Sequence, residues 1–357
     1  MTQGELTGRE VWERFCEDLK LAGAVLDDPS TPRDGVTQAE GVRCLARLIA
    51  MGMEVALEHA DGEHPWVFLA RTPTKLSGGV SPDAIYHEAF IDGMHTYRIV
   101  GTRGTAPMLE IGVYAGKLGL QEQSRLIGQI CEDDINVDVE GRFEVVLSAD
   151  PRRNPTIVLE PDASYIYIRN YSLDWTRDTA ATFTITADDI TELPAPLSLD
   201  AIDHGLDGAQ RYVREVSRAF AATIGWNKER ATNTLVPIDP AQPTSMPGGH
   251  LLACGYFALQ PGEALTVTFD PATAPYWSLG LCNHWMEPMD WRWRTSSINK
   301  RSARPEPDGT VTVGIGPNAG LARNWLDTAG HPEGLMIFRW ARTEDPLPVF
   351  TVTTSPH

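Results

Sequence analysis

The segment EGRFEVVLSADPRRN, residues 140–154, recurs later in the chain as DGTVTVGIGPNAGLARN, residues 308–324. In both copies an acidic residue and a glycine precede a run of apolar residues, and an asparagine ends the segment. The matching residues, at offsets of 168, 170 and 170, are Gly141 and Gly309, Asn154 and Asn324, and Arg169 and Arg339. A nearly constant offset predicts two duplicated β modules, and a pocket between modules is the default ligand site.

The sequence around both copies is typical of antiparallel β structure. From Trp66 to about residue 190, and again from His250 onward, runs rich in Val, Ile, Tyr and Phe alternate with Gly, Pro and Asp turns. In SYIYIRNYS, residues 164–172, the alternation places Tyr165, Tyr167 and Arg169 on one face. This spacing favours β-sandwich or jelly-roll modules over alternating βαβ units.

Three stretches have the three- and four-residue apolar spacing of amphipathic helices, at 8–26, 37–59 and 199–224. Thr37 and Glu40 have the spacing of a capping box at the start of the second helix. We therefore predict a mainly β chain with helical additions, of class α+β. Its four parts are an N-terminal helical hairpin at 1–62, a first β module at 63–192, a linker and connecting helix at 193–245, and a second β module at 246–357.

Composition excludes several classes of partner. The chain has 357 residues with 48 acidic and 30 basic side chains, giving a formal net charge of −18. Such a surface repels phosphate, so we expect neither a nucleic-acid partner nor a membrane partner. The five cysteines form no Cys-x-x-Cys pair, and no signal-peptide pattern opens the chain. We expect a cytoplasmic protein with reduced thiols, and the sequence leaves a homo-oligomer open.

Four motifs in the C-terminal half resemble a bacterial family, the domain of unknown function twelve-fourteen. They are YWSLGL at 276–281, DGTVTV at 308–313, RNWL at 323–326 and GLMIFRWA at 334–341. The resemblance extends from about residue 80 to the end, and implies a two-module β-sandwich without a settled activity. The segment TSSIN, residues 295–299, departs from the Tyr-containing pattern expected there.

The insert HWMEPMDW, residues 284–291, has no counterpart in the first module, which makes it the favoured place for added function. His284 is the candidate proton donor or acceptor, because imidazole titrates near neutral pH, and Glu287 or Asp290 is its candidate partner. Arg292 and Arg294 could clamp an anionic group. The structural alternatives are a hydrogen-bonded histidine and ordinary salt bridges.

Aromatic residues supply the candidate substrate-binding surface. If the insert continues as a strand, Trp291 and Trp293 share one face and could stack on a sugar ring or a flat ligand, or else pack in a core. A second cluster of titratable and aromatic residues lies between Tyr86 and Arg98. The candidate substrate-binding residues are Trp285, Trp291, Arg292, Trp293, Arg294, Tyr97, His87 and Trp325.

Our leading prediction is an enzyme that acts on a small organic molecule, carbohydrate-like or aromatic, by acid–base chemistry. It would be a hydrolase or lyase with its pocket at the module interface, and would use neither an organic cofactor nor a metal. The sequence has no G-x-S-x-G elbow and no phosphate-binding loop. The alternatives are a non-catalytic carbohydrate- or small-molecule-binding protein with a tryptophan stacking platform, and a structural protein whose aromatics are all core.

Overall fold

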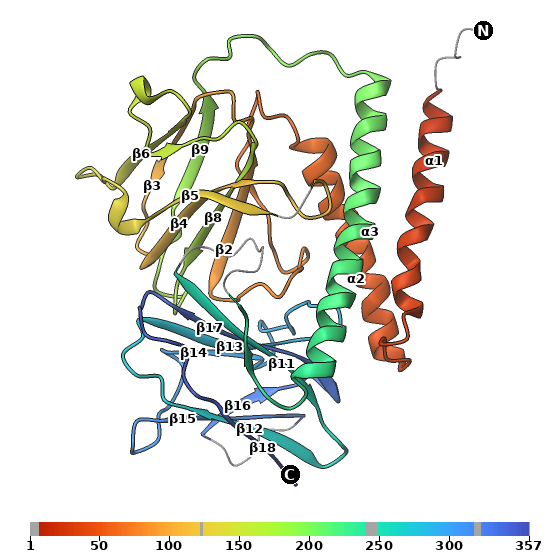
Figure 1. Ribbon diagram of the computed structural model, residues 1–357, viewed down its shortest axis with the longest axis vertical. Helices are drawn as coiled ribbons and strands as arrows, with labels where there is room; N and C mark the ends of the chain where they lie inside the picture. The colour runs from red at the N-terminus through yellow and green to blue at the C-terminus, as the bar shows by residue number, and fades with distance from the viewer. Residues whose placement is uncertain (1–6, 122–123, 240–248, 318–322, 357) are drawn as a thin grey trace.

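The computed structural model describes residues 7–121, 124–239, 249–317 and 323–356. Residues 318–322 of the second repeated segment, and residues 246–248 at the predicted start of the second module, lie outside these ranges. Three α-helices and eighteen strands are assigned among the described residues (Figure 1). The helices are α1 (Gly8–Lys20), α2 (Gly35–Met53) and α3 (Leu199–Arg230), with a 3-10 helix η1 (Leu21–Asp27) and a π-helix η2 (Glu54–Glu58) continuing α1 and α2.

The first module is a sandwich of a five-stranded and a four-stranded sheet. The five-stranded sheet has the order β1-β2-β8-β4-β5 and the four-stranded sheet the order β7-β6-β3-β9. Every pair is antiparallel except β6 with β7. The strands are β1 (Phe68–Leu69), β2 (Ala84–Phe90), β3 (Tyr97–Thr102), β4 (Met108–Ala115), β5 (Arg125–Cys131), β6 (Arg142–Ser148), β7 (Ile157–Val158), β8 (Ala163–Tyr171) and β9 (Thr182–Ala187).

The second module repeats this arrangement strand for strand. Its sheets have the orders β10-β11-β17-β13-β14 and β16-β15-β12-β18, and its parallel pair, β15 with β16, corresponds to β6 with β7. The two predicted sandwich modules are therefore present, while their origin by duplication stays a prediction. The strands are β10 (Val236–Pro237), β11 (His250–Ala258), β12 (Glu263–Phe269), β13 (Tyr276–Cys282), β14 (Ser297–Asn299), β15 (Val311–Gly316), β16 (Asn324–Asp327), β17 (Glu333–Ala341) and β18 (Thr351–Pro356).

Two of the residue correspondences hold in the fold and one does not. Arg169 and Arg339 are each the seventh residue of a nine-residue strand, β8 and β17, and both are buried. Gly141 and Gly309 both have left-handed backbone, with φ of 79° and 90°. Asn154 ends a 3-10 turn with φ of 49°, whereas Asn324 begins β16 and its side chain bonds the backbone of residues 304 and 312.

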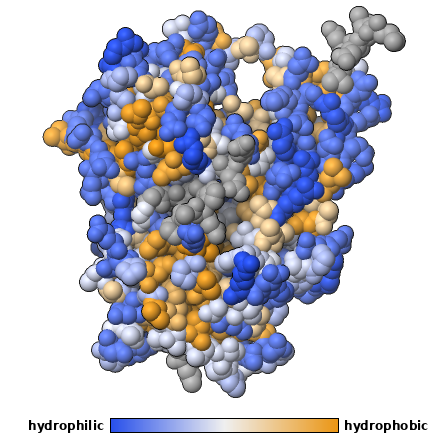
Figure 2. Space-filling view, in the orientation of Figure 1, coloured by the Kyte–Doolittle hydropathy of each residue, from blue (hydrophilic) through white to orange (hydrophobic). Residues whose placement is uncertain are grey.

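Each module has its own apolar core between its two sheets. The outer faces of the five-stranded sheets are covered by helices instead. In the first module, tyrosines of β2, β4 and β8 pack against α2 and α3, and in the second module Ile224 of α3 packs on β11 and β17. The long helix α3 thus touches both modules and also packs against α1 (Figure 1). On the face shown in Figure 2, hydrophilic residues gather over α1 and α3, and hydrophobic patches lie over the modules.

The two modules meet at their strand ends through packed residues. Met108, Tyr171 and Tyr276 form an apolar cluster there, and the Tyr276 hydroxyl donates to Asp83 Oδ2 at 3.0 Å. Asn299 Nδ2 donates to the other oxygen of Asp83 at 2.9 Å. No helix among the described residues is long and apolar enough to cross a membrane.

The start of α2 differs from its prediction. Asp34 caps this helix, since its Oδ1 accepts from the N–H groups of Val36 and Thr37 at 3.0 and 2.9 Å. The predicted Thr37–Glu40 capping box is therefore wrong. Because the Glu40 side chain does not cap the helix, it contacts Asn283 and His331 of the second module.

Candidate functional site

The insert is a tight loop rather than a strand. After β13, the Asn283 side chain accepts from the N–H groups of Trp285 and Glu287, at 3.0 and 3.1 Å, and Met286 has a φ of 56°. Residues 291–294 then form a turn, and the Trp293 side chain is 83% exposed. The predicted alternation of tryptophans and arginines on a strand is therefore wrong, because the Asn283 turn reverses the chain.

Trp285 docks the insert onto α2. Its indole N–H donates to the carbonyl of Thr37 at 2.8 Å, and its ring is only 5% exposed. The ring lies so close to Gly41 that a Cβ at that position would come within 2.4 Å of it. Trp285 is therefore covered by α2 and offers no free face for a ligand.

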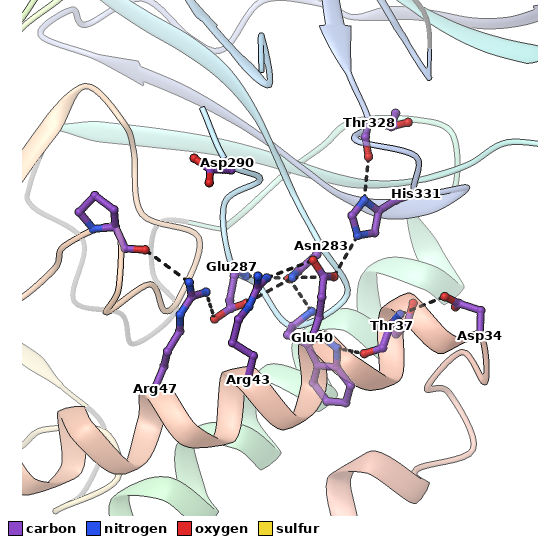
Figure 3. Close-up of polar contacts among 12 residues, drawn as sticks. Asp34, Thr37, Glu40, Arg43, Arg47, Asn283, Glu287, Asp290, Thr328 and His331 are labelled. Carbon is purple, nitrogen blue, oxygen red and sulfur yellow. Dashed lines mark hydrogen bonds and ion pairs between the residues drawn. The ribbon is translucent and has the colours of Figure 1, made fainter. Parts of the chain in front are cut away.

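Two carboxylates bind the second module to α2. Glu287, 1% exposed, accepts from Arg47 Nη1 at 2.7 Å, and Arg43 lies 3.6 Å away. Glu40 accepts from Asn283 Nδ2 at 3.0 Å and contacts His331 Nε2 at 2.9 Å (Figure 3). We call this cluster the clasp, and it consists of Glu40, Arg43, Arg47, Asn283, Glu287 and His331.

His331 is held at both ring nitrogens. Nδ1 bonds the carbonyl of Thr328 at 2.8 Å and Nε2 bonds Glu40 (Figure 3). Burial lowers the pKa of His331, but the bond to Glu40 and its charge raise it more, so the pKa lies above its ordinary value. With both nitrogens engaged, His331 has no position left to exchange a proton with a ligand.

Among the described residues no hydrogen bond or ion pair joins any two of the three predicted catalytic residues, although Arg43 lies 3.6 Å from Glu287 and, after the larger effect of Arg292, also lowers the pKa of Asp290. His284 is buried with Nδ1 3.2 Å from the Tyr256 hydroxyl, and burial lowers its pKa to about 4. Glu287 belongs to the clasp. Asp290 lies at the surface and accepts two bonds from Arg292, at 2.8 and 2.6 Å. The structure does not bring these side chains together.

A pocket of about 200 Å³ lies beside the clasp. Its charged lining residues have ion-pair partners, for example Arg294 with Asp327, which lies outside the pocket, at 2.8 Å and Arg43 with Glu40 at 3.1 Å. Of the predicted site residues, Asp290, Trp291, Arg292 and Arg294 line this pocket. Trp325 lies elsewhere, on β16 beside Gly316. We therefore interpret this pocket as the edge of the contact between α2 and the second module, and not as a ligand site.

The second predicted cluster divides between the two sheets of the first module, because its strand residues lie on β2 and β3. The His87 ring packs edge-on against Phe183, with centroids 5.2 Å apart, and burial lowers its pKa to about 4. Tyr97 is fully buried, and its hydroxyl donates to the carbonyl of Gly62 at 2.7 Å. Both side chains are structural. Glu88 follows His87 on β2 and therefore points to the opposite face, toward the helices.

Glu88 lies in a second pocket, which we call the first-module cavity. This space of about 140 Å³ lies between the five-stranded sheet and α3 and is partly open. Lys117 Nζ is 2.6 Å from Glu88 Oε2, and Arg71 Nη1 is 3.5 Å from Oε1. The walls are formed by Ser77, Gly78, Val80, Leu118, Ser124, Tyr165, Tyr167, Tyr212, Val216 and Phe220.

Burial and charge act against each other in this cavity. Burial raises the pKa of Glu88, but the charges of Lys117 and Arg71 lower it more, so it lies below its ordinary value. Burial, together with the charges of Arg71 and Arg169, lowers the pKa of Lys117 by more than Glu88 raises it. The Lys117 ammonium also lies 4.4 Å from the Tyr165 ring centre. Perturbed groups in a cavity are typical of functional sites.

Sequence reasoning missed Arg71, Lys117 and Tyr212. Arg71 and Lys117 follow β1 and β4 in loops without a motif, and Tyr212 belongs to the apolar stripe of α3. The one available signal was Glu88, which stands in a dense run of titratable residues. Among the described residues, Asp61, Glu63 and His64 also bring metal-type ligands together, on an exposed loop where His64 bonds Asp61 and the carbonyl of Glu192.

The fold and the two sites define a protein of two β-sandwich modules. The helices pack on both modules, because α3 contacts the outer face of each five-stranded sheet. A crystal structure of an uncharacterised protein from Burkholderia cenocepacia has a TM-score of 0.93 and 32% identity to this chain, and covers 97% of each chain. The chain belongs to the same family as that protein. Residues 258–344 match the family described as "Protein of unknown function (DUF1214)".

Other likenesses are weak. The VPA0106 protein from Vibrio parahaemolyticus has a TM-score of 0.46 and 11% identity, over 95% of this chain and 99% of that one. Salicylate 1,2-dioxygenase from Pseudoaminobacter salicylatoxidans has a TM-score of 0.20 and 10% identity, over 96% and 93%. These two scores are too low to carry an argument. No curated protein matches the sequence.

Proposed function

We propose that this chain is an enzyme that acts on a small organic molecule by acid–base chemistry in the first-module cavity. The observation that carries the proposal is a bonded Lys117–Glu88 pair, almost fully buried, in the wall of a partly open cavity. Burying two ions costs several kcal/mol each by order of magnitude, and a salt bridge alone repays this poorly. A catalytic use explains why such a pair lines an accessible space.

Lys117 is the group that exchanges a proton. Because burial lowers its pKa, its amine is formed at a lower pH than in an exposed lysine. Glu88 holds the side chain in place and stabilises the ammonium after a proton has arrived. The positive charge of Arg71 favours negative charge that develops on the substrate.

The reaction that fits these roles is an elimination, which makes the protein a lyase. Neutral Lys117 takes a proton from a substrate carbon next to an electron-withdrawing group. The electron pair of that C–H bond forms a double bond, and the leaving group on the next carbon departs with its bonding pair. Hydrolysis through a histidine-activated serine or cysteine has less support, since the described lining residues include no histidine.

A second candidate function is non-catalytic binding of the same kind of molecule. Tyr165, Tyr167 and Tyr212 line the cavity, and tyrosine rings stack on flat or carbohydrate ligands. Tyr165 and Tyr167 already stack on Tyr114 and Tyr86, so Tyr212 is the ring that this candidate requires. In this candidate the stacking platform is formed by Tyr212 in place of the predicted tryptophans. The two functions differ in whether replacing Lys117 stops turnover or only weakens binding.

The test follows elimination from a panel of β-hydroxy carbonyl and carboxyl compounds by proton NMR, with the full chain. Lys117→Met should lower turnover by about 10²- to 10⁴-fold, the usual contribution of a general base. The matched control is Lys75→Met, because Lys75 also pairs with a glutamate, Glu54 at 2.7 Å, outside the cavity. Equal turnover in the two variants would refute the catalytic proposal. Binding without turnover in the unaltered protein would favour the second candidate.

A further inference from the structure

We infer that the first-module cavity selects a flat, ring-sized molecule that carries a single carboxylate. This inference rests on the proposed function, because elimination makes the two reacting carbons planar, and a site that prefers a flat ring is matched to the product of that reaction. The charge of the lining residues supports a monoanion, and an unused hydrogen-bond donor supports a carboxylate. The size and the walls of the cavity support a flat ring.

The charge of the lining residues requires an anion. Arg71, Lys117 and Glu88 are the charged residues that line the cavity, so two cations face one carboxylate once Lys117 has taken the proton. Both Glu88 oxygens are already taken, Oε2 by Lys117 and Oε1 by Arg71. A buried charge without a counter-charge is costly, and one bound monoanion would neutralise it. A dianion would leave the cavity with an excess negative charge.

Arg71 supplies the donor for that anion. Its Nη1 donates to the carbonyl of Ala70 at 2.9 Å, while its buried Nε has no hydrogen-bond partner among the described residues. A guanidinium presents its donors as a planar fork that matches the two oxygens of a carboxylate. The unused Nε is thus a donor that a ligand carboxylate would satisfy.

The size and walls of the cavity define the rest of the ligand. Its volume of about 140 Å³ is close to that of the roughly 150 Å³ engineered cavity that binds benzene. Tyr212 and Phe220 of α3 lie on the helix side, whereas Tyr167 on the sheet side already has the Arg169 guanidinium 4.1 Å from its ring centre. The aromatic wall on the helix side favours a flat body, and the volume admits one ring.

The probe is benzoate. It is compared with benzamide, which is neutral, with phthalate, which is a dianion, and with cyclohexanecarboxylate, whose ring is puckered. Calorimetry with the full chain should show benzoate binding about 10- to 100-fold more tightly than benzamide, the value of a charged hydrogen bond. Phthalate and cyclohexanecarboxylate should both bind more weakly than benzoate.

Arg71→Gln should remove the preference for benzoate over benzamide. Arg125→Gln is the matched control, since Arg125 is half exposed and pairs with Glu160 outside the cavity. If Arg71→Gln does not fold, the comparison of benzoate with benzamide on the unaltered chain decides alone. Equal affinity for these two probes would overturn the carboxylate while leaving the Lys117 chemistry standing. If neither binds, the substrate class is wrong, and loss of turnover in Lys117→Met still decides the proposed function separately.

Discussion

The clasp and the first-module cavity both bury charge beneath α2 or α3, yet they differ in whether every hydrogen-bond donor has a partner. In the clasp, Glu287 faces Arg47, and Glu40 faces His331 and Arg43. In the cavity, one carboxylate serves two cations beside open space. Burial of ionisable groups is therefore a poor guide to function by itself. What separates the two regions is an unused donor, because Arg71 Nε in the cavity has no hydrogen-bond partner, whereas no buried side-chain nitrogen or oxygen of the clasp lacks one among the described residues.

The largest expected effect comes from opening the clasp. Glu287→Gln removes the charge opposite buried Arg47, and breaking a buried pair in this way should lower the free energy of unfolding by about 3–5 kcal/mol. Asp290→Asn is the control, because the Asp290–Arg292 pair is 42% and 44% exposed and should contribute less than about 1 kcal/mol. Urea unfolding measures both. Equal losses would show that Glu287 has no special role in stability.

The second prediction concerns acid. Folded His284 has a pKa of about 4, against 6.5 when unfolded, so the unfolded chain binds its proton first as pH falls. Stability should decrease from pH 6.5 to about pH 4, by roughly 3 kcal/mol in the limit for this histidine. His284→Gln should be less sensitive to acid over this interval. An unchanged slope of unfolding free energy against pH would contradict this assignment.

His331 in the clasp should respond in the opposite direction. Its folded pKa is raised, so its contribution is fully present below the unfolded pKa and is lost as pH rises through the folded value. The two histidines therefore sharpen the comparison. His284 forms no ion pair among the described residues, whereas His331 is paired with Glu40.

The third prediction tests how closely α2 and the insert fit. Gly41→Ala places a methyl group against the Trp285 ring and should cost about 1–3 kcal/mol, as overpacked substitutions do. Gly225→Ala is the control, since a Cβ there meets nothing within 4 Å on α3 and should stabilise the helix by up to about 1 kcal/mol. In thermal unfolding, the midpoint temperature should fall for Gly41→Ala and rise for Gly225→Ala. A neutral Gly41→Ala would mean that the insert moves away at little cost.

The smallest expected effect is on the cavity. Lys117→Met leaves Glu88 opposite Arg71, one charge against one, and removes the cost of burying an ammonium. Its unfolding free energy should change by less than about 1 kcal/mol, although turnover is lost. Glu88→Gln should instead cost several kcal/mol, because it leaves two cations without their carboxylate. A Lys117→Met loss as large as that of Glu287→Gln would remove the distinction between the two regions.

The fold was predictable because its signals are local and repeated. Alternation along residues 164–172 and apolar spacing in the helices fix the type of each element, and the repeated segment indicates two modules. The equivalence of Arg169 and Arg339 was visible in the offset alone. Asn154 and Asn324 were misaligned, because equal residue types at a matching offset need not have equal backbone conformations.

The site was less predictable because its contacts join distant segments. The insert as the place of added function stays a prediction, and Glu287 meets Arg47 across 240 residues, a contact that no spacing rule reveals. Of the predicted catalytic residues, Glu287 docks the insert onto α2, while His284 and Asp290 have other partners. Arg71 and Lys117 lie in irregular loops that only the packing of α3 on the sheet turns into a cavity.

Helix α3 also has a mechanical consequence. Its 32 residues span about 48 Å at 1.5 Å per residue. Tyr212 and Phe220 line the cavity, while Lys228, further along the same rod, pairs with Glu333 of β17 at 2.9 Å. Because the helix moves as one rigid body, a ligand that displaces the Tyr212 and Phe220 rings also shifts the part of α3 that contacts the second module.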